Sequence, residues 1–410
     1  MKYEKLSKLF YKMDADSYDK EYKKRTCSYG SYSTSLKIRG FRKGHLTNDS
    51  FELFYVNTHE LMNLNNEVLL NSSKISSLIS QLPKFVVKPY FNKLIINEAQ
   101  SNNEIEGIRS TKKELKEALK ALEQSEPQHK RFVGLMKTYQ FIDQIHSFTS
   151  VHDFRKLYDE LVADEIVAED APDGELFRKG YVEVNDGNMT THIGVSSEQK
   201  ITEALEALIV YLHDESHPQL YRYMTAHYYY EYIHPFYDGN GRTGRLIVGS
   251  YLSRYLEKYS AITFSYAVNK NKEKYYKALE EIPSPLNRGE MTFYLMNMLE
   301  LLLSGQKGII EDLELNLMKL KRINNYINSD QWGDDKEERE LFRIIITFNV
   351  FVNEHETLSV QELMKISDKS RHIVNKVMDY LEQKGFVEMV SRRPKSYKIS
   401  EECLEEILPS

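Results

Sequence analysis

The sequence predicts a mainly α-helical protein with a short β-hairpin flap and a small α/β domain toward its C-terminal end. Three observations indicate this fold. Apolar residues recur at helical spacing through most of the chain. A strong hairpin signal, Asp186-Gly187, interrupts that pattern. Residues 338–400 combine two helical segments with two short strand-like segments.

The elements follow in order along the chain. Residues 1–60 are polar and weakly periodic, and 39–44 is interpreted as a solvated loop, with a basic contact surface as the alternative. Helical periodicity starts near Glu67. Alternation at Val182 and Val184 before the turn predicts a two-stranded flap over 181–192. The predicted helices are 67–83, 88–100, 198–213, 219–233, 246–256, 275–279 and 292–303, with a connecting helix in 305–335.

The chain is expected to have several domains, since 410 residues are too many for one compact core. The expected division has an N-terminal helical region, a central domain, a connecting helix and a small C-terminal domain. Their predicted ranges are 1–110, 111–305, 306–337 and 338–410.

Composition excludes several classes of protein. The net charge of −6 does not favour binding of the whole chain to nucleic acid or an anionic membrane. Cys27 and Cys403 alone cannot form a zinc site or a disulfide framework, so a reducing compartment is expected. The start lacks a secretory signal, and no run approaches the ~20 apolar residues of a membrane span. We therefore expect a cytoplasmic protein without a membrane partner.

The segment from His234 to Arg245 carries the strongest chemical signal. Three glycines in six residues, directly before a predicted helix, let backbone N–H groups converge on an anion at the helix start. Asn240 adds a donor, and Arg242 and Arg245 share one face of the first turn, which suits a polyphosphate. The segment therefore predicts a phosphate cradle.

Two further residues of this segment bring reactive groups. Asp238 supplies the hard oxygen ligand that Mg²⁺ takes when it also bridges phosphates. His234, which Pro235 biases away from helical geometry, is basic and mostly neutral near pH 7. A P-loop is disfavoured because Arg245-Leu246 replaces Lys-Ser/Thr, and a zinc site because the histidines lack H-E-x-x-H spacing.

Residues 234–245 resemble, at every defined position, the signature of the Fic (filamentation induced by cAMP) family of AMP transferases, His-x-Phe-x-Asp-Gly-Asn-Gly-Arg-x-x-Arg. The likeness extends over about 65–305 and includes Phe177-Arg-Lys-Gly-Tyr-Val-Glu-Val, which is similar to the family's flap. It implies a Fic-type helical bundle whose catalytic domain is 111–305.

The resemblance also implies roles for individual residues. His234 would deprotonate a Tyr, Thr or Ser hydroxyl of a target protein, possibly the protein itself, which then attacks the α-phosphate of ATP. The flap, 181–192, would pair with an extended target segment. The remaining implied ligands are Asp238 for Mg²⁺, Gly239, Asn240, Gly241 and Arg242 for the α- and β-phosphates, with Thr243 and Gly244 in the same loop, Arg245 for the γ-phosphate, and Tyr275 or Tyr276 for the adenine.

Upstream, Glu106-Gly107 resembles the end of the inhibitory helix of Fic proteins, Ser/Thr-x-x-x-Glu-Gly/Asn. The Ser/Thr position falls on Asn102, with Ser101 one residue out of register. The resemblance implies that Glu106 occupies the guanidinium of Arg245 and excludes the γ-phosphate. An exposed acidic helix end is the alternative, and the same glutamate can serve AMP removal in this family.

The C-terminal segment resembles a winged helix-turn-helix domain in the order of its elements. Ser359-Val-Gln-Glu362 is a capping box, and Gly385 is expected to end a second helix. Nine Lys and Arg against five Asp and Glu give 359–400 a charge of +4. DNA binding through this segment and a protein-contact or homodimerisation role are both open. The alternative for the whole chain is a DNA-binding transcriptional regulator whose Fic core senses nucleotide or modifies only itself. A Fic enzyme that removes AMP or uses another nucleotide is the alternative within the same chemistry.

Overall fold

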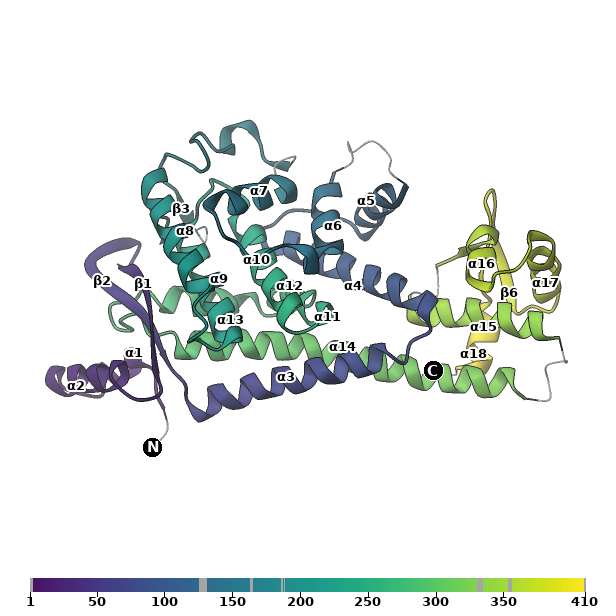
Figure 1. Cartoon of the computed structure of the whole chain (residues 1–410), viewed down its shortest axis with the longest axis horizontal. Helices are drawn as coiled ribbons and strands as arrows, with labels where there is room; N and C mark the ends of the chain where they lie inside the picture. Colours follow the sequence, from purple (N-terminus) through teal and green to yellow (C-terminus); the bar gives the residue numbers. More distant parts are fainter. Residues whose placement is uncertain are drawn as a thin grey trace. The chain divides into compact units, whose positions relative to one another are not determined.

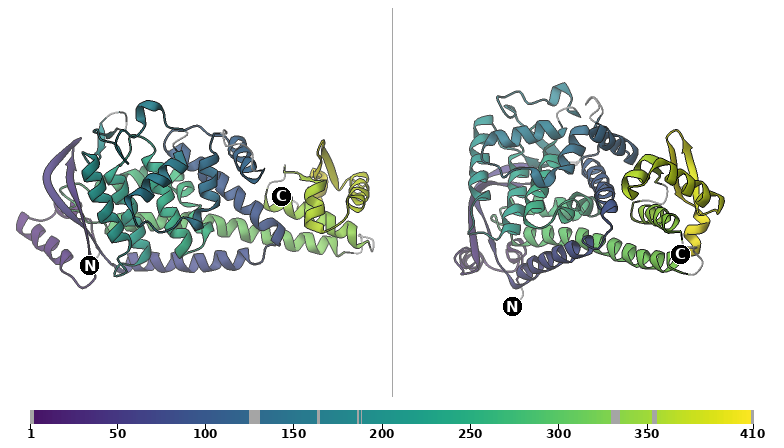
Figure 2. Two further views of the ribbon diagram at one scale, coloured as in Figure 1. Left: turned by 45° about the horizontal axis from the view of Figure 1, so that its top comes forward. Right: turned by 45° about the vertical axis from the view of Figure 1, so that its right-hand side comes forward.

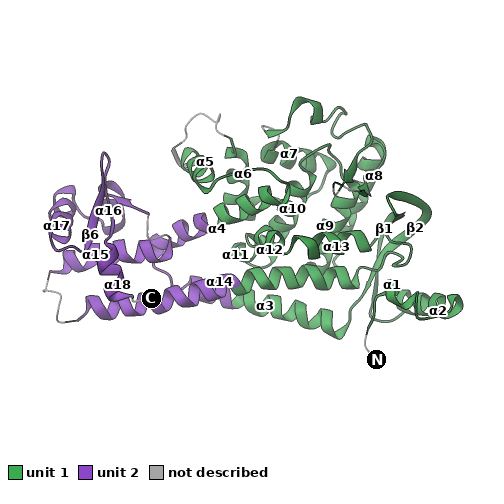
Figure 3. Ribbon diagram, turned by 180° about the vertical axis from the view of Figure 1, so that it is seen from behind, with its two compact units in different colours: residues 1–73, 94–307 green, residues 74–93, 308–410 purple. Residues whose placement is uncertain are grey.

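The computed structural model of the chain describes residues 3–124, 131–162, 165–185, 187, 189–329, 335–352 and 356–408. These residues form two compact units, one of residues 1–73 and 94–307 and the other of residues 74–93 and 308–410 (Figure 3). The predicted mainly helical fold is confirmed, and the described residues also form three small antiparallel sheets beside the helices (Figure 1).

The first unit contains most of the elements. Its elements are α1 (Leu6–Leu9), α2 (Ala15–Thr26), β1 (Ser31–Arg42), β2 (His45–Val56), α3 (His59–Ile79), α4 (Lys84–Ile105), α5 (Lys112–Gln124), α6 (Val133–Gln140), η1 (Ile142–Gln144), α7 (Val151–Val162), η3 (Ala168–Asp170), β3 (Glu183–Asn185), β4 (Thr190–Ile193), α8 (Glu198–Leu212), α9 (Gln219–Ile233), α10 (Asn240–Tyr255), α11 (Lys258–Ala261), α12 (Phe264–Lys270), α13 (Lys272–Glu281) and α14 (Thr292–Ile327). The elements η1 and η3 are 3₁₀ helices, and α3, α4 and α14 continue into the other unit. Helices α9 and α10 lie side by side in the interior, with α8 packed on α9 and α7 and α11 packed on α10.

The predicted helix at 219–233 is present with those bounds, and the Tyr-rich face of α9 is buried as packing surface. The separate helices expected at 292–303 and in 305–335 are instead one continuous helix, α14. Gly305 does not end it. A Cβ there would lie 2.4 Å from the Thr263 hydroxyl, so this glycine lets α14 pack closely against Thr263, the residue before α12.

The interpretation of 39–44 as a solvated loop is wrong. These residues form the end of a long hairpin, β1–β2, which lies at the same end of the first unit as α2 (Figure 2). Leu36, Ile38 and Gly40 are buried while Lys37 and Arg39 are exposed, which is the period of a strand with one face on a core. The turn uses positive φ angles at Lys43 and Gly44.

The second unit has its own apolar core, built from the end of α14 and from α15 (Lys336–Phe351), β5 (Leu358–Ser359), α16 (Val360–Ser367), α17 (Arg371–Gln383), β6 (Val387–Arg392), β7 (Lys395–Ile399) and α18 (Glu401–Ile407). The strands form one sheet in the order β5-β7-β6. The predicted capping box at Ser359 and Glu362 is present, and Gly385 follows α17 with φ of 76°. The predicted polar stretch at the end of the connecting segment lies partly in 330–334, outside the described residues.

No helix in the described part of the chain has the length and apolar character of a membrane span.

Candidate active site

The candidate site begins where α9 ends. His234 closes this helix in a left-handed conformation, with φ of 52° and ψ of 63°, and Pro235 prevents the helix from continuing. Gly239, at φ of 80°, then starts α10. The chain therefore reverses direction between two buried helices, and the reversal presents His234 beside the N-terminus of α10.

The loop between these helices is held by its own side chains. Asn240 accepts the backbone N–H of Phe236 at 2.9 Å through Oδ1 and donates to its carbonyl at 2.8 Å through Nδ2. The Thr243 hydroxyl donates to the Gly239 carbonyl at 2.9 Å, and the Phe236 ring stacks on Tyr158. The loop is preformed, and the amide of Asn240, predicted as a phosphate donor, is engaged with Phe236.

The imidazole of His234 is oriented by a backbone acceptor. Its Nδ1 lies 3.3 Å from the Glu231 carbonyl, which can only accept a hydrogen bond, so Nδ1 carries the proton and Nε2 keeps its lone pair. Burial, together with the neighbouring His192 ring, holds the pKa of His234 well below its ordinary value. His234 is therefore a neutral proton acceptor at pH 7.

Arg178 is a positioning residue that the sequence did not single out. This fully buried guanidinium donates to backbone carbonyls of His234 at 2.8 Å, Gly180 at 2.6 Å and Val195 at 2.7 Å. Burial lowers its pKa to about 10. Arg178 thereby ties both ends of the flap to His234. Because its main partners are carbonyls rather than charged side chains, no residue pattern reveals the contact.

The predicted flap is present as the antiparallel pair β3–β4, with Val184 opposite His192. Gly187 has φ of 91° in the turn, while Asp186 of the predicted Asp-Gly signal lies outside the described residues, as does Asn188. His192 Nε2 donates to the Tyr232 carbonyl at 2.9 Å, and burial lowers the pKa of His192 to about 4. The base of the flap is thereby fixed next to the end of α9.

A cavity of about 140 Å³ opens beside His234. It brings together six of the predicted site residues, namely His234, Gly241, Arg245, Tyr275, Tyr276 and Glu106. Its other lining residues include Val184 and Thr191 from the flap and Glu231 and Tyr232 from α9. The predicted residues that do not line it are Asp238, Gly239, Asn240, Arg242, Thr243 and Gly244, which form the loop and the first turn behind it.

Arg245 already binds a carboxylate in this cavity. Its Nη2 donates to Glu106 Oε1 at 2.6 Å and its Nε donates to Asn102 Oδ1 at 2.6 Å. Asn102, the residue at the Ser/Thr position of the resemblance, also donates to the Tyr139 hydroxyl at 2.8 Å. The predicted contact between Glu106 and Arg245 is present, and an amide takes the place of the hydroxyl.

Gly241 makes room for that contact. A Cβ at this position would lie 2.3 Å from Glu106 Oε1 and 3.1 Å from Arg245 Nη1. Only a residue without a side chain lets an anionic group approach the start of α10 here.

Arg242 has a different environment. Its Nη1 donates to Glu165 Oε2 at 3.1 Å, and both side chains are buried. Its carbonyl accepts from Asn102 Nδ2 at 3.3 Å. In this structure Arg242 ties the first turn of α10 to the segment after α7, rather than facing the cavity.

Asp238 is exposed, and its Oδ1 accepts the N–H of Gly239 at 2.6 Å. Among the described residues, no group of three or more His, Cys, Asp and Glu side chains could hold a metal ion. A single exposed carboxylate fits Mg²⁺ only when nucleotide phosphates supply further ligands, because Mg²⁺ favours one or two carboxylates together with phosphates and water.

Three more titratable side chains line the cavity, namely Tyr275, Tyr276 and Glu231. Tyr275 is buried with its hydroxyl 2.8 Å from His227 Nε2, whereas Tyr276 is partly exposed. Burial raises the pKa of Glu231 to about 8, so this carboxyl is mostly protonated at pH 7 and competes weakly with Glu106 for Arg245.

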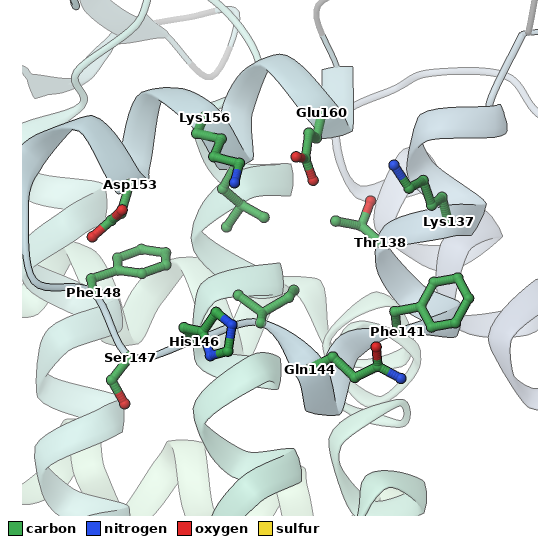
Figure 4. A pocket seen from close by; sticks show the side chains of 12 residues that line it. Lys137, Thr138, Phe141, Gln144, His146, Ser147, Phe148, Asp153, Lys156 and Glu160 are labelled. Atoms are coloured by element: carbon green, nitrogen blue, oxygen red, sulfur yellow. The ribbon is translucent and has the colours of Figure 1, made fainter.

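A second cavity, of about 310 Å³, lies on α6, η1 and α7 (Figure 4). Lys156 and Glu160 point toward it from α7, Lys137 points toward it from α6, and Gln144 and His146 lie on the opposite side from α7. None of the residues predicted for the site is among its lining residues, so it is separate from the cavity at His234.

Comparison with known proteins agrees with this geometry. Residues 147–252 match the Fic/DOC family. The matched segment contains the flap, Arg178 and the whole of His234–Arg245, while Asn102 and Glu106 lie upstream of it.

Among solved structures, the chain is similar to a Fic family protein from Desulfovibrio desulfuricans G20, with 17% identity over 88% of this chain and 99% of that chain and a TM-score of 0.52. This similarity shows a shared fold. A Fic domain containing signaling protein from Bacteroides thetaiotaomicron VPI-5482 matches at 18% identity over 62% of this chain and 95% of that chain, with a TM-score of 0.44. Fic-1 (aa134–508) from C. elegans matches at 17% identity over 62% and 74%, with a TM-score of 0.44.

Proposed function

We propose that this protein transfers the AMP group of ATP to a hydroxyl group of a protein, either itself or another, and that Glu106 restrains the reaction. One observation carries the proposal. The buried guanidinium of Arg245 holds an anionic oxygen in the same cavity that His234 lines with a neutral imidazole able to accept a proton. An anion site beside a proton acceptor is what nucleotidyl transfer to a hydroxyl requires.

In the proposed reaction a proton moves to His234, one phosphorus–oxygen bond forms and one breaks. His234 Nε2 takes the proton of the target hydroxyl while its oxygen attacks the α-phosphorus of ATP. The bond between the α-phosphorus and the oxygen that leads to the β-phosphate breaks, and pyrophosphate leaves. The N-terminus of α10 and Gly241 offer backbone N–H groups to the phosphates, and Arg245 offers its guanidinium to the γ-phosphate once Glu106 has left.

Asp238 is the residue that would hold Mg²⁺ together with the nucleotide phosphates. When bound, the ion would neutralise part of the phosphate charge. The flap is the expected docking place for the target. Its short strands could add an extended target segment by backbone pairing and present a hydroxyl to His234.

The test is the intact mass of the protein after incubation with ATP and Mg²⁺, wild type beside Glu106→Gly. We expect Glu106→Gly to gain the mass of one adenylate and to incorporate on the order of ten times more label than wild type, which corresponds to about 1.4 kcal/mol favouring the closed contact. Adding His234→Ala to Glu106→Gly is the matched control and should abolish incorporation.

Other results would identify related activities. A mass gain with GTP, UTP or CTP but not ATP would assign a different nucleotide. Loss of label from a modified protein on addition of the wild type would assign AMP removal. No mass gain with any nucleotide, combined with no nucleotide binding, would refute the proposal.

The second unit supports a second proposal, binding of DNA. Three of the nine basic residues of 359–400 are engaged with carboxylates, in the ion pairs of Lys369, Lys395 and Lys398. The exposed ones include Arg371 and Lys376 on α17 and Arg392 and Arg393 at the turn between β6 and β7. A helix beside a basic hairpin is the arrangement with which winged helix-turn-helix domains meet phosphates.

Retention of the full chain on duplex DNA at increasing salt tests this second proposal. The double variant Arg392→Glu/Arg393→Glu should lose retention and flatten the salt dependence. The matched control, Arg42→Glu/Lys43→Glu, reverses two exposed charges at the turn between β1 and β2 and should behave as wild type. Equal retention of both variants would contradict DNA binding by this surface.

A further inference from the structure

Three polar side chains on one face of α4 reach the helices around the candidate site. Glu98, Asn102 and Glu106 are four residues apart, which places them one above another on a helix, with Glu106 one residue beyond its last turn. Asn102 and Glu106 contact Arg245. Glu98 is not among the residues that line the cavity, and the proposed chemistry does not use it.

Glu98 is instead bound to the start of α12. Its Oε1 accepts the N–H of Ser265 at 2.7 Å, and its Oε2 accepts the N–H of Tyr266 at 2.8 Å. The residue is only 2% exposed. Both carboxylate oxygens are therefore used, and they satisfy two N–H groups that the helix itself leaves without partners.

A buried carboxylate is costly unless it is well hydrogen bonded. Burial raises the pKa of Glu98 to about 7, while the hydrogen bonds from Ser265 and Tyr266 and the charge of Arg245 oppose this rise. An apolar side chain would fill this helix interface without the cost of burying a carboxylate. The contact of Glu98 with α12 is therefore expected to have a function other than packing.

The geometry of α4 supplies the role. Eight residues of α-helix separate Glu98 from Glu106, a rigid distance of roughly 12 Å. A helix fixed at Glu98 cannot slide or rotate without withdrawing Glu106 from Arg245. The contacts from Asn269 and Lys272 to Glu104 are exposed and therefore contribute less, while the buried Asn102 binds Arg245 itself and is part of the inhibitory contact.

We propose that Glu98 is the positioning residue of the inhibitory contact: by binding the first N–H groups of α12 it holds α4 in the place where Glu106 occupies Arg245. This inference rests on the proposed function, since it concerns the regulation of the same site. It assigns Glu98 an effect on nucleotide binding that passes entirely through Glu106.

A double-mutant cycle on the full chain tests it. The variants are Glu98→Gln, Glu106→Gly and the double variant beside wild type, and the readouts are ATP affinity by calorimetry and self-incorporation of AMP. Gln has nearly the same shape but replaces one acceptor oxygen with an amide donor, so one of the two N–H bonds must break. Against wild type, Glu98→Gln should raise both readouts on the order of tenfold, as expected for the loss of one hydrogen bond to a charged group.

The Glu106→Gly background separates a positioning role from a structural one. There, Glu98→Gln should change ATP affinity and incorporation less than twofold, because the inhibitory side chain is already absent. Glu104→Gln, on the same helix but exposed, is the matched control and should equal wild type in both readouts. No rise in the wild-type background, or an equal change in both backgrounds, would overturn the inference.

Two further arms keep the test decisive. If Glu98→Gln does not fold, as judged by thermal denaturation, Glu98→Asp keeps the charge but shortens the reach and should show a smaller rise with the same dependence on Glu106. If Glu106→Gly takes up no AMP at all, the proposed transfer fails. The affinity arm would then still report on the contact through Glu98.

Discussion

Arg242 and Arg245 make two ion pairs, one turn apart in α10, that look alike in sequence and differ in the structure. Both arginines are almost fully buried, and each donates to a glutamate from a distant part of the chain. The glutamate of Arg242, Glu165, has a side chain only 6% exposed, whereas that of Glu106 is 28% exposed. A buried partner cannot leave without stranding a charge, but a partner at the cavity mouth can move into water.

The comparison assigns different tasks to the two arginines of one motif. The Arg242–Glu165 pair holds the first turn of α10 in place. In the proposed function the Arg245–Glu106 pair is the exchangeable one, because an incoming phosphate would take over the guanidinium from a carboxylate that water can solvate. Two experiments can break or sharpen this distinction, and a third tests the neighbouring His234; they are given from the largest expected effect to the smallest.

Glu165→Gln should destabilise the protein by about 3–5 kcal/mol, because it leaves Arg242 buried without its counter-charge. Glu106→Gln should cost less, because Arg245 keeps its hydrogen bonds to Asn102 and lines a cavity in which water can reach its guanidinium. Urea denaturation of both variants beside wild type measures the difference. A similar loss in the free energy of unfolding for both variants would contradict the distinction between the two ion pairs.

Arg245→Lys in the Glu106→Gly background should weaken ATP binding by roughly 10- to 100-fold, the loss expected when a fork of donors to a phosphate becomes a point charge. AMP has no γ-phosphate, so its affinity should stay within about threefold and serves as the control. Calorimetric titration with both nucleotides makes the measurement. An equal loss for ATP and AMP would place Arg245 elsewhere on the nucleotide.

The smallest expected effect is a change in the protonation of His234 with pH. Burial and His192 lower the pKa of His234, so its imidazole should stay neutral as the pH falls from 7.5 to 5.5. In the unfolded chain the same side chain takes up a proton near pH 6.5, and acidification below that value therefore favours unfolding. Deuterium exchange at the imidazole C2–H position, followed by mass spectrometry, reports this pKa. A midpoint near 6.5 would contradict the enclosed setting of the ring.

The sequence predicted the helical class, the flap and the helix-to-helix reversal at His234, because each has a local cause: periodic apolar residues, an alternating segment, and a proline followed by glycines. It missed the β1–β2 hairpin. Its alternation was present at 36–40 but was outweighed by the polar character of the surrounding residues.

Of the candidate site, the positions within 234–245 were predictable, and the partners that set their environment mostly were not. The contact of Glu106 with Arg245 followed from a resemblance and is present. Arg178, Glu165 and Glu98 act through carbonyls, a distant arginine and the start of another helix. Such contacts join residues 50 to 170 positions apart, and no local pattern records them. The catalytic roles of the site residues stay predictions.

The absent side chain at position 241 has a consequence for how this protein can be altered. Glu106 lies where a side chain at position 241 would begin, and the proposed function places the nucleotide phosphates in the same space beside the start of α10. A larger residue at position 241 would displace both the Glu106 carboxylate and the phosphates. Such a variant would therefore lose the restraint and the proposed activity together. A change that removes the restraint and keeps the proposed activity therefore has to be made in α4 or in Glu106, which follows the end of this helix.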